Sequence, residues 1–269
     1  MRRWADDGQI QMTRTAGGHR KIARAEAIRF IRTTSTEVVR PDLLQISEPP
    51  HRHERSAAFG AQRDELLKAL RKGDGEVVFG LLTRMYVNGV SIADICDGPL
   101  RHAMDEIGTL WPANKKSILI EHRATNICID ALNRLRASLP AARNSKVVAV
   151  GGAPENDPYV LPSLMVTTVL TDVGFTAVNL GPNTPLDVIS QSAEQRHTKL
   201  AWVSFTAPPK RTKVDALVEN TAKQLRRKKV HLVIGGQSAS KCKLPANRYL
   251  HAFPSLSEMA GFAKSLLSE

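Results

Sequence analysis

The feature that most constrains the fold is the alternation of short apolar segments with helical sequence between residues 145 and 269. β-Branched and other apolar residues dominate the short segments, and sequence of helical character separates each from the next. This alternation predicts a doubly wound parallel sheet with right-handed crossovers, the Rossmann-like arrangement of an α/β domain. The predicted strands are residues 146–150, 177–180, 200–205 and 230–234.

The carboxyl ends of these strands are where we expect a binding site. Open parallel sheets hold their ligands in the crevice beyond those ends. Polar or glycine-containing sequence follows three of the predicted strands, as a site there would require. These segments are residues 154–162, 204–206 and 235–238.

Residues 56–142 carry apolar side chains at spacings of three and four, which is the pattern of amphipathic helices. Four such segments with short connections predict a four-helix bundle. Gly98-Pro99 should bend or split the third segment, because proline disrupts the interior of a helix. The four segments are residues 61–71, 76–87, 91–107 and 117–138.

Residues 1–32 are rich in arginine and lysine, in a chain whose formal net charge is +12. Gly17-Gly18 predicts a tight hairpin turn, and residues 25–31 predict a short helix. A basic hairpin beside a helix suits docking on phosphates, while composition alone equally allows a solvated basic terminus. Residues 33–55 hold three prolines among polar residues and are predicted to be a linker.

A tryptophan and a Glu-His pair stand near the beginning of the last helical segment. Trp111, Glu121 and His122 follow the pattern W-x9-E-H, with the tryptophan at the joint before the helix and the other two on its first turns. This arrangement predicts an aromatic plate and an imidazole over a flat ligand. The alternatives are a core tryptophan and a histidine on a solvated helix surface, because the spacing alone is weak evidence.

Other classes of protein are disfavoured by what the sequence lacks. Cys96, Cys128 and Cys242 are widely spaced and form no C-x-x-C pair for zinc or redox work, and Cys128 is expected to be a buried thiol. The sequence shows neither the apolar core of a signal peptide nor a long uncharged apolar run, so we expect a soluble cytoplasmic protein without membrane contact. No catalytic constellation stands out, and we do not expect an enzyme.

Two resemblances extend these expectations to a multi-domain α and α/β protein. The segment R-R-W-A-D-D-G-Q-I-x-x-x-R-T-A-G-G-H-R-K-I resembles the end of the recognition helix and the wing of a MerR-type winged helix-turn-helix. The bundle followed by the doubly wound sheet resembles a cobalamin-binding module. In this order of modules the chain resembles the light-sensing, cobalamin-dependent repressors of the CarH/LitR type, whose bundle motif is W-x9-E-H.

The resemblance implies a transcriptional repressor that binds double-stranded DNA and forms a homo-oligomer, with light-responsive adenosylcobalamin as its cofactor. Trp111 would pack over the upper face of the corrin, and Glu121 would contact the adenosyl side. His122 would become a cobalt ligand after light cleaves the cobalt–carbon bond. Only part of the DNA-binding domain is matched, because the chain begins within the recognition helix. The implied DNA contacts are Arg2, Arg3, Arg14, His19, Arg20 and Lys21.

The lower face of the implied cobalamin site departs from the family pattern D-x-H-x-x-G. The loop reads D-P-Y-V-L-P, so Tyr159 takes the position of the cobalt-ligating histidine and Pro162 that of the glycine. A phenol with an unperturbed pKa of about 10 is a costly ligand near neutral pH, which favours packing over ligation for Tyr159. Pro162 can instead open the following helix. The implied contacts that remain are Asp157, Ser204, Thr206, Gly235 and Gly236.

Three functions stay open on the sequence. The first is a MerR-type regulator that still binds cobalamin through His122 and Trp111. The second is a related regulator whose sensor has lost cobalamin or binds another ligand, and which acts by oligomerisation. The third is a corrinoid carrier that serves methyltransferases, which the wing and the missing lower histidine disfavour.

Overall fold

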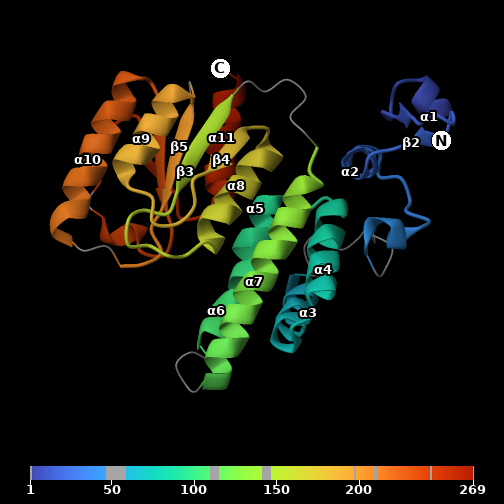
Figure 1. The fold of residues 1–269 in the computed structure, drawn as a ribbon, viewed down its shortest axis with the longest axis horizontal. Coiled ribbons are helices and arrows are strands. Elements are labelled where there is room, and N and C mark those ends of the chain that lie inside the picture. Colours follow the sequence, from blue (N-terminus) through green and yellow to red (C-terminus); the bar gives the residue numbers. More distant parts are fainter. Residues whose placement is uncertain are drawn as a thin grey trace. The chain divides into compact units, whose positions relative to one another are not determined.

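The computed structural model describes residues 2–46, 59–109, 115–140, 147–196, 198–208, 211–242 and 244–268. Two compact units make up the chain, Met1–Ala141 and Ala142–Glu269. The first unit is helical apart from one small hairpin, and the second alternates strands and helices (Figure 1). Among the described residues, no helix combines the length and the apolar character that crossing a membrane requires.

The N-terminal segment of the first unit contains the predicted hairpin and helix. Its two short strands pair antiparallel around Gly18, whose φ of +77° suits the turn. Leu44 and Ile46 are buried, so the first part of the predicted linker packs against other residues. The elements are α1 (Arg2–Asp6), β1 (Thr13–Arg14), β2 (Arg20–Lys21), α2 (Arg24–Thr34) and a 3-10 helix at Pro41–Leu44.

The predicted bundle follows, with each of its four segments in place. Its third segment is not one straight helix, because Cys96–Leu100 forms a π-helical turn around Gly98-Pro99. Proline lacks the N–H that a regular helix requires at this point, which explains the wider turn. The helices are α3 (Phe59–Lys72), α4 (Gly75–Val87), α5 (Ile92–Ile95), α6 (Arg101–Thr109) and α7 (Lys115–Ala137).

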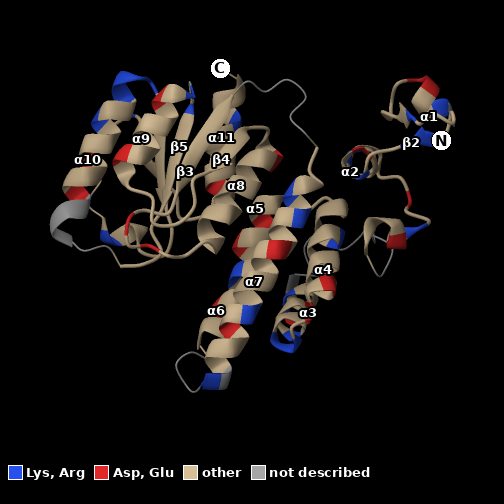
Figure 2. Cartoon of the chain, viewed as in Figure 1, with Lys and Arg blue, Asp and Glu red and all other residues tan. Residues whose placement is uncertain are grey.

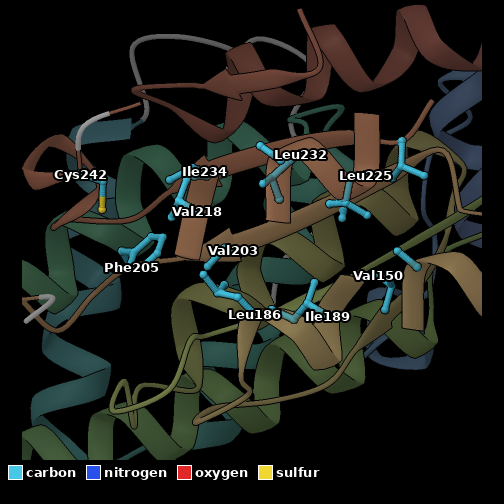
Figure 3. Packing of buried hydrophobic residues seen from close by; sticks show 14 residues of the cluster. Val150, Leu186, Ile189, Val203, Phe205, Val218, Leu225, Leu232, Ile234 and Cys242 are labelled. Atoms are coloured by element: carbon cyan, nitrogen blue, oxygen red, sulfur yellow. The ribbon is translucent and has the colours of Figure 1, made fainter. Parts of the chain in front are cut away.

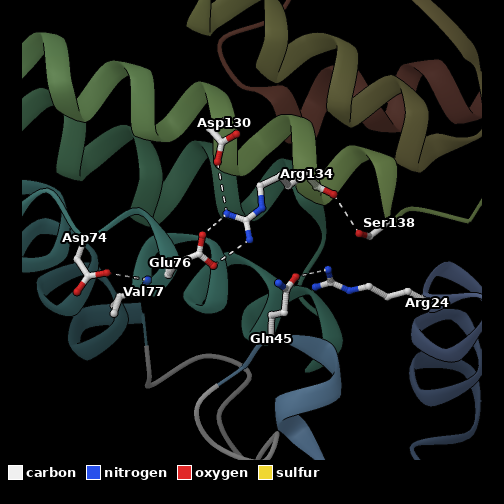
Figure 4. A network of polar contacts seen from close by, with 8 residues as sticks. All are labelled: Arg24, Gln45, Asp74, Glu76, Val77, Asp130, Arg134 and Ser138. Carbon is white, nitrogen blue, oxygen red and sulfur yellow. Dashed lines mark hydrogen bonds and ion pairs between the residues drawn. The ribbon is translucent and has the colours of Figure 1, made fainter.

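Arg134 of α7 ties this helix to α4. Its guanidinium donates to both carboxylate oxygens of Glu76, at 2.7 and 2.9 Å (Figure 4). It also lies 3.9 Å from the centroid of the Phe79 ring. Asp74 caps the beginning of α4 by accepting the N–H of Val77 at 3.3 Å. The polar contacts therefore fix where α4 begins and which face of it meets α7.

The second unit is built on a five-stranded parallel sheet in the order β4-β3-β5-β6-β7. This order confirms the predicted doubly wound topology. A fifth strand, β7, was not predicted, because three residues are too few to show a pattern. The strands are β3 (Val148–Gly152), β4 (Thr176–Asn179), β5 (Leu200–Ser204), β6 (His231–Gly235) and β7 (Leu250–Ala252).

Helices cover both faces of this sheet. One face packs its buried side chains against α9 and α10, as Figure 3 shows for Val203, Ile189 and Val218. The other face meets α8 and α11, since the indole of Trp202 reaches α8 and the ring of His231 lies 5.4 Å from that of Phe262 in α11. The helices are α8 (Leu161–Val173), α9 (Leu186–Gln195), α10 (Arg211–Arg227) and α11 (Leu256–Ser268).

Positive charge on the second unit is visible at the C-terminal end of α10 (Figure 2). The last turn of this helix carries Arg226 and Arg227, both exposed. Cations at a helix C-terminus interact favourably with the helix dipole. The charge at this point therefore has a structural explanation within the helix itself.

Candidate functional site

The loops that follow β3 and β5 meet beside the point where the order of the sheet reverses. The strand β3 has β4 on one side and β5 on the other, so the chain leaves the two central strands in opposite directions. Such a switch point leaves a crevice at the carboxyl ends of the strands, where open α/β sheets bind ligands. The segments predicted to form a site therefore lie at the edge of the sheet where such folds bind ligands.

Asp157 joins these two loops. Its Oδ2 accepts the backbone N–H of Thr206 at 2.5 Å and that of Ala207 at 2.9 Å, and its Oδ1 accepts the N–H of Tyr159 at 3.2 Å. The side chain is only 2 % exposed. Three backbone donors occupy the carboxylate, so Asp157 braces the crevice and is not free to orient a ligand.

The loop after β6 joins the same cluster. Ser238 donates its Oγ–H to the carbonyl oxygen of Thr206 at 2.9 Å, and its own N–H to that of Phe205 at 2.9 Å. The Oγ1 of Thr206 is buried and has no hydrogen-bond partner among the described residues. An unsatisfied buried hydroxyl is costly, so a polar group brought against this atom would be stabilising.

Two neighbouring glycines have different roles at this edge. Gly236 has a φ of +98°, and a Cβ there would lie 2.3 Å from the carbonyl oxygen of Phe205, so the backbone packing requires glycine. A Cβ on Gly235 would meet nothing within 4 Å. Gly235 therefore borders open space, and Ser204 is its register partner on β5. The rim of the crevice has room beside Gly235 and a free hydroxyl at Thr206.

The loop between β3 and α8 presents no imidazole to this crevice. Tyr159, at the position of the histidine in the family pattern, is 50 % exposed, so its ring is not a packed interior residue. Pro162 lies in the first turn of α8, where proline is tolerated because no N–H is needed. The loop therefore leads directly into α8, and Tyr159 gives it no nitrogen atom that could ligate cobalt.

The Glu-His pair lies on the surface of α7 in the first unit. The side chain of His122 is 68 % exposed, and its Nε2 lies 3.5 Å from Oε2 of Glu121. Glu121 also accepts the hydroxyl hydrogen of Thr125 at 3.0 Å, which orients the carboxylate along the helix. Trp111, the remaining member of the motif, lies outside the described residues.

His122 also borders a shallow depression of about 470 Å³ on the bundle surface. Within the part of the chain that the structure describes, no group of three or more His, Cys, Asp or Glu side chains could hold a metal ion. The depression is lined by Gly75, Leu119, His122, Arg123, Asn126, Ile127 and Asp130.

Comparison with known proteins identifies the class of ligand. Residues 62–136 match the family model described as the B12 binding domain. The dimethylamine corrinoid proteins 2 and 1 of Methanosarcina acetivorans are both 24 % identical to the chain. They match over 65 % and 79 % of it, and over 82 % and 94 % of their own lengths. The monomethylamine corrinoid protein of Methanosarcina barkeri shares the fold, with a TM-score of 0.54 and 18 % identity over 78 % of this chain and 100 % of that one.

These findings confirm the prediction of a cobalamin cofactor. The crevice at the sheet fits a corrin in two respects, since it offers open space beside Gly235 and the unpartnered hydroxyl of Thr206. Amide groups surround a corrin ring and can satisfy such a hydroxyl. The fit does not extend to a protein ligand for cobalt at Tyr159. The contacts implied for Trp111, Glu121 and His122 stay predictions.

The interpretation as a MerR-type, light-sensing repressor is wrong. The relatives are corrinoid proteins and not MerR-type regulators, and a winged helix-turn-helix is not shown. The motif R-T-A-G-G-H-R specifies a tight hairpin, which the structure does contain, but a hairpin does not determine a function. Double-stranded DNA is likewise wrong as a partner. The DNA contacts assigned by that resemblance, Arg2, Arg3, Arg14, His19, Arg20 and Lys21, lose their basis.

Contacts within the first unit occupy part of the basic charge of this segment. Arg20 lies 3.3 Å from Asp6, and Arg29 donates to both oxygens of Glu26. Arg32 donates to the carbonyl oxygens of Tyr86 and Val90. Of the residues assigned as DNA contacts on the hairpin, Arg20 is thus paired, whereas Arg14, His19 and Lys21 are exposed.

Sequence reasoning missed Trp202 and Ser163 as residues of the site region. Trp202 is 1 % exposed, and its indole N–H donates to the Oγ of Ser163 at 3.1 Å. The tryptophan was visible only as a member of an apolar strand. Its register partner, Gly151, is what gives the ring its position, and sequence alone does not show that pairing.

Proposed function

We propose that this protein is a corrinoid carrier of a methyl-transfer system, which presents its cofactor to methyltransferases and is not itself an enzyme. The observation that carries the proposal is the braced crevice at the switch point of the sheet, where Asp157 holds the loops beside open space at Gly235. The match of the bundle to a B12 binding domain, and the dimethylamine corrinoid proteins among the relatives, support the same class of function.

The residues of the crevice would hold and orient the corrinoid. When bound, this cofactor supplies a cobalt ion that can accept a methyl group from one molecule and donate it to another. Thr206 would offer its free hydroxyl to an amide group of the ring, and Gly235 would let the ring approach the backbone. Asp157 would keep the crevice open by fixing Thr206 and Ala207, whose amides it binds.

A carrier must also leave the reactive face of its cofactor accessible to a partner enzyme. His122 is exposed on α7, with Glu121 half-buried beside it, so the imidazole can meet a cofactor or partner without an opening of the bundle. The chemistry would then reside in the corrinoid and in the partner's active site.

Methyl transfer from the loaded protein tests this proposal. The full chain is incubated with methylcobalamin, freed of excess by gel filtration, and mixed with a corrinoid-dependent methyltransferase and a thiol acceptor. We expect the loaded protein to transfer its methyl group at least about tenfold faster than free methylcobalamin at equal concentration, because binding orients the cofactor for the enzyme. Equal rates for the bound and free cofactor would contradict a carrier function.

The Gly235→Leu variant provides the matched control. A Cβ at this position would meet nothing within 4 Å, so the leucine side chain would extend from the backbone into the open space beside β6. We expect this variant to retain less corrin after gel filtration and to transfer methyl groups more slowly in proportion. Retention equal to that of the wild type would show that the crevice is not the binding site.

A further inference from the structure

One register row crosses the whole sheet on the face covered by α8 and α11. It runs through Asn179, Gly151, Trp202, Val233 and His251, one residue from each strand. Gly151 lacks a side chain, and the indole of Trp202 takes that place: a Cβ on Gly151 would lie 2.4 Å from Cδ2 of the ring. The indole of Trp202 on β5 therefore also covers the neighbouring strand β3 at Gly151.

Hydrogen bonds fix this ring against α8. The indole N–H donates to Oγ of Ser163 at 3.1 Å, and Ser163 donates in turn to Oδ1 of Asn179 at 3.0 Å. A buried indole N–H requires such a partner. Trp202 and Ser163 are each 1 % exposed, so the indole occupies a buried position between β3, β5 and α8.

The crevice is consequently open at its rim and closed at its floor. Side chains alternate between the two faces along a strand, so Ser204 lies on the same face as Trp202, two residues closer to the carboxyl end. Its register partner, Gly235, borders the open space. A ligand can rest on this rim, but a group that continues inward along this face meets the indole.

Cobalamin has such a group, since a nucleotide tail ending in the bicyclic base dimethylbenzimidazole hangs from one face of its ring. This base is about the size of an indole, and packed protein interiors contain few voids larger than a water molecule. We propose that Trp202 excludes the nucleotide tail from this domain, so that the corrinoid binds at the rim with its tail outside. This inference rests on the proposed corrinoid function and makes Trp202 a determinant of specificity.

The binding of two corrinoids to the wild-type full chain tests the inference. Methylcobalamin and methylcobinamide share the corrin and the methyl group, but only methylcobalamin carries the nucleotide tail. A tail that stays in solvent adds little to binding, so we expect the two dissociation constants to differ by less than about tenfold. A preference for methylcobalamin above about tenfold would show a buried tail and overturn the inference.

The indole N–H of Trp202 gives a second readout that does not depend on affinity. Its resonance can be assigned among the three tryptophans by its loss in the Trp202→Phe variant. We expect its exchange with solvent to stay slow when methylcobalamin is added. Displacement of the ring by an entering tail would break the bond to Ser163, accelerate the exchange and contradict the proposal.

Substitution of the tryptophan should change the preference. In Trp202→Gly the floor would open beside Gly151, and we expect methylcobalamin to gain affinity relative to methylcobinamide by about tenfold or more. An unchanged ratio in a folded variant would mean that another group excludes the tail. Should this variant fail to fold, Ser163→Ala, which frees the indole without deleting it, is expected to shift the ratio in the same direction.

These outcomes separate the inference from the proposed function. Similar dissociation constants without methyl transfer would contradict the carrier function and leave the role of Trp202 supported. Methyl transfer together with a strong preference for methylcobalamin over methylcobinamide would support the carrier function and contradict the role of Trp202. If neither corrinoid binds, both the carrier function and the role of Trp202 are overturned.

Discussion

Gly235 and Gly236 show how much two adjacent residues of one type can differ. In Gly236→Ala, the new Cβ would approach the carbonyl oxygen of Phe205 to 2.3 Å at a φ of +98°. We expect this variant to lose about 2–4 kcal/mol of unfolding free energy, because neither the backbone angle nor the contact can relax cheaply. Urea unfolding of the purified chain measures the loss.

Gly235→Ala is the control for that prediction. Its Cβ would meet nothing within 4 Å, and alanine loses less backbone entropy than glycine on folding. We expect its unfolding free energy to equal that of the wild type or to exceed it by about 0.5–1 kcal/mol. Equal losses in the two variants would mean that the local backbone differs from the one described.

Cys128 is a buried thiol, as its position in the apolar helix predicts. Burial raises the pKa of this thiol to about 12, while its unfolded pKa is about 8.5. Between these two pKa values the folded state keeps the thiol proton that the unfolded state loses. The contribution of the protonated thiol to the unfolding free energy is therefore fully present below about pH 8.5 and is lost as the pH rises. The corresponding slope is about 1.4 kcal/mol per pH unit.

The Cys128→Ala variant isolates this contribution. Unfolding free energies of the variant and the wild type, measured from pH 8 to pH 11, share every other titrating group. We expect the advantage of the wild type over the variant to shrink as the pH rises above about 8.5. A difference that stays constant across this range would show that the folded thiol ionises as readily as the unfolded one.

At the scale of elements, Arg134 carries more of the packing between α7 and α4 than its charge suggests. Its side chain is 28 % exposed, whereas that of its partner Glu76 is 73 % exposed. An exposed ion pair contributes about 0–1 kcal/mol, but the contact of the guanidinium with the Phe79 ring adds a cation–π term. Arg134 should therefore contribute more to the unfolding free energy than Glu76.

We expect Arg134→Ala to lower the unfolding free energy by about 1–2 kcal/mol, through loss of the aromatic contact and of the packed methylene groups. Glu76→Gln should lower it by less than about 1 kcal/mol, since only the ion pair is weakened. Chemical unfolding of the two variants side by side measures both values. A larger loss for Glu76→Gln would place the main contribution in the ion pair instead.

Most elements of this chain could be predicted because each repeats a pattern that is local in sequence. Spacings of three and four located the bundle helices, and β-branched runs located four strands. The bend at Gly98-Pro99 followed from the chemistry of one residue pair. What the sequence could not supply was register: that Trp202 lies opposite Gly151, or that Asp157 reaches the amides of Thr206 and Ala207, depends on how distant segments pair.

At the scale of the whole molecule, the topology of the sheet follows from the sequence pattern, and it indicates the edge at which open α/β sheets bind ligands. Its cofactor was predicted from a resemblance, and the family comparison bears that out. The function attached to the same resemblance was wrong, because a basic hairpin does not determine a function and the binding module is shared by different kinds of corrinoid protein. Modules indicate ligands more reliably than they indicate functions.

The central claim is that the full chain binds one corrinoid at the switch-point crevice of its sheet. Equilibrium dialysis of the chain against methylcobalamin, with wild type and Gly235→Leu in parallel, tests it most directly. We expect saturable binding of about one corrin per chain for the wild type and an affinity at least about tenfold weaker for the variant. Absence of saturable binding, or equal affinities for the two proteins, would contradict it.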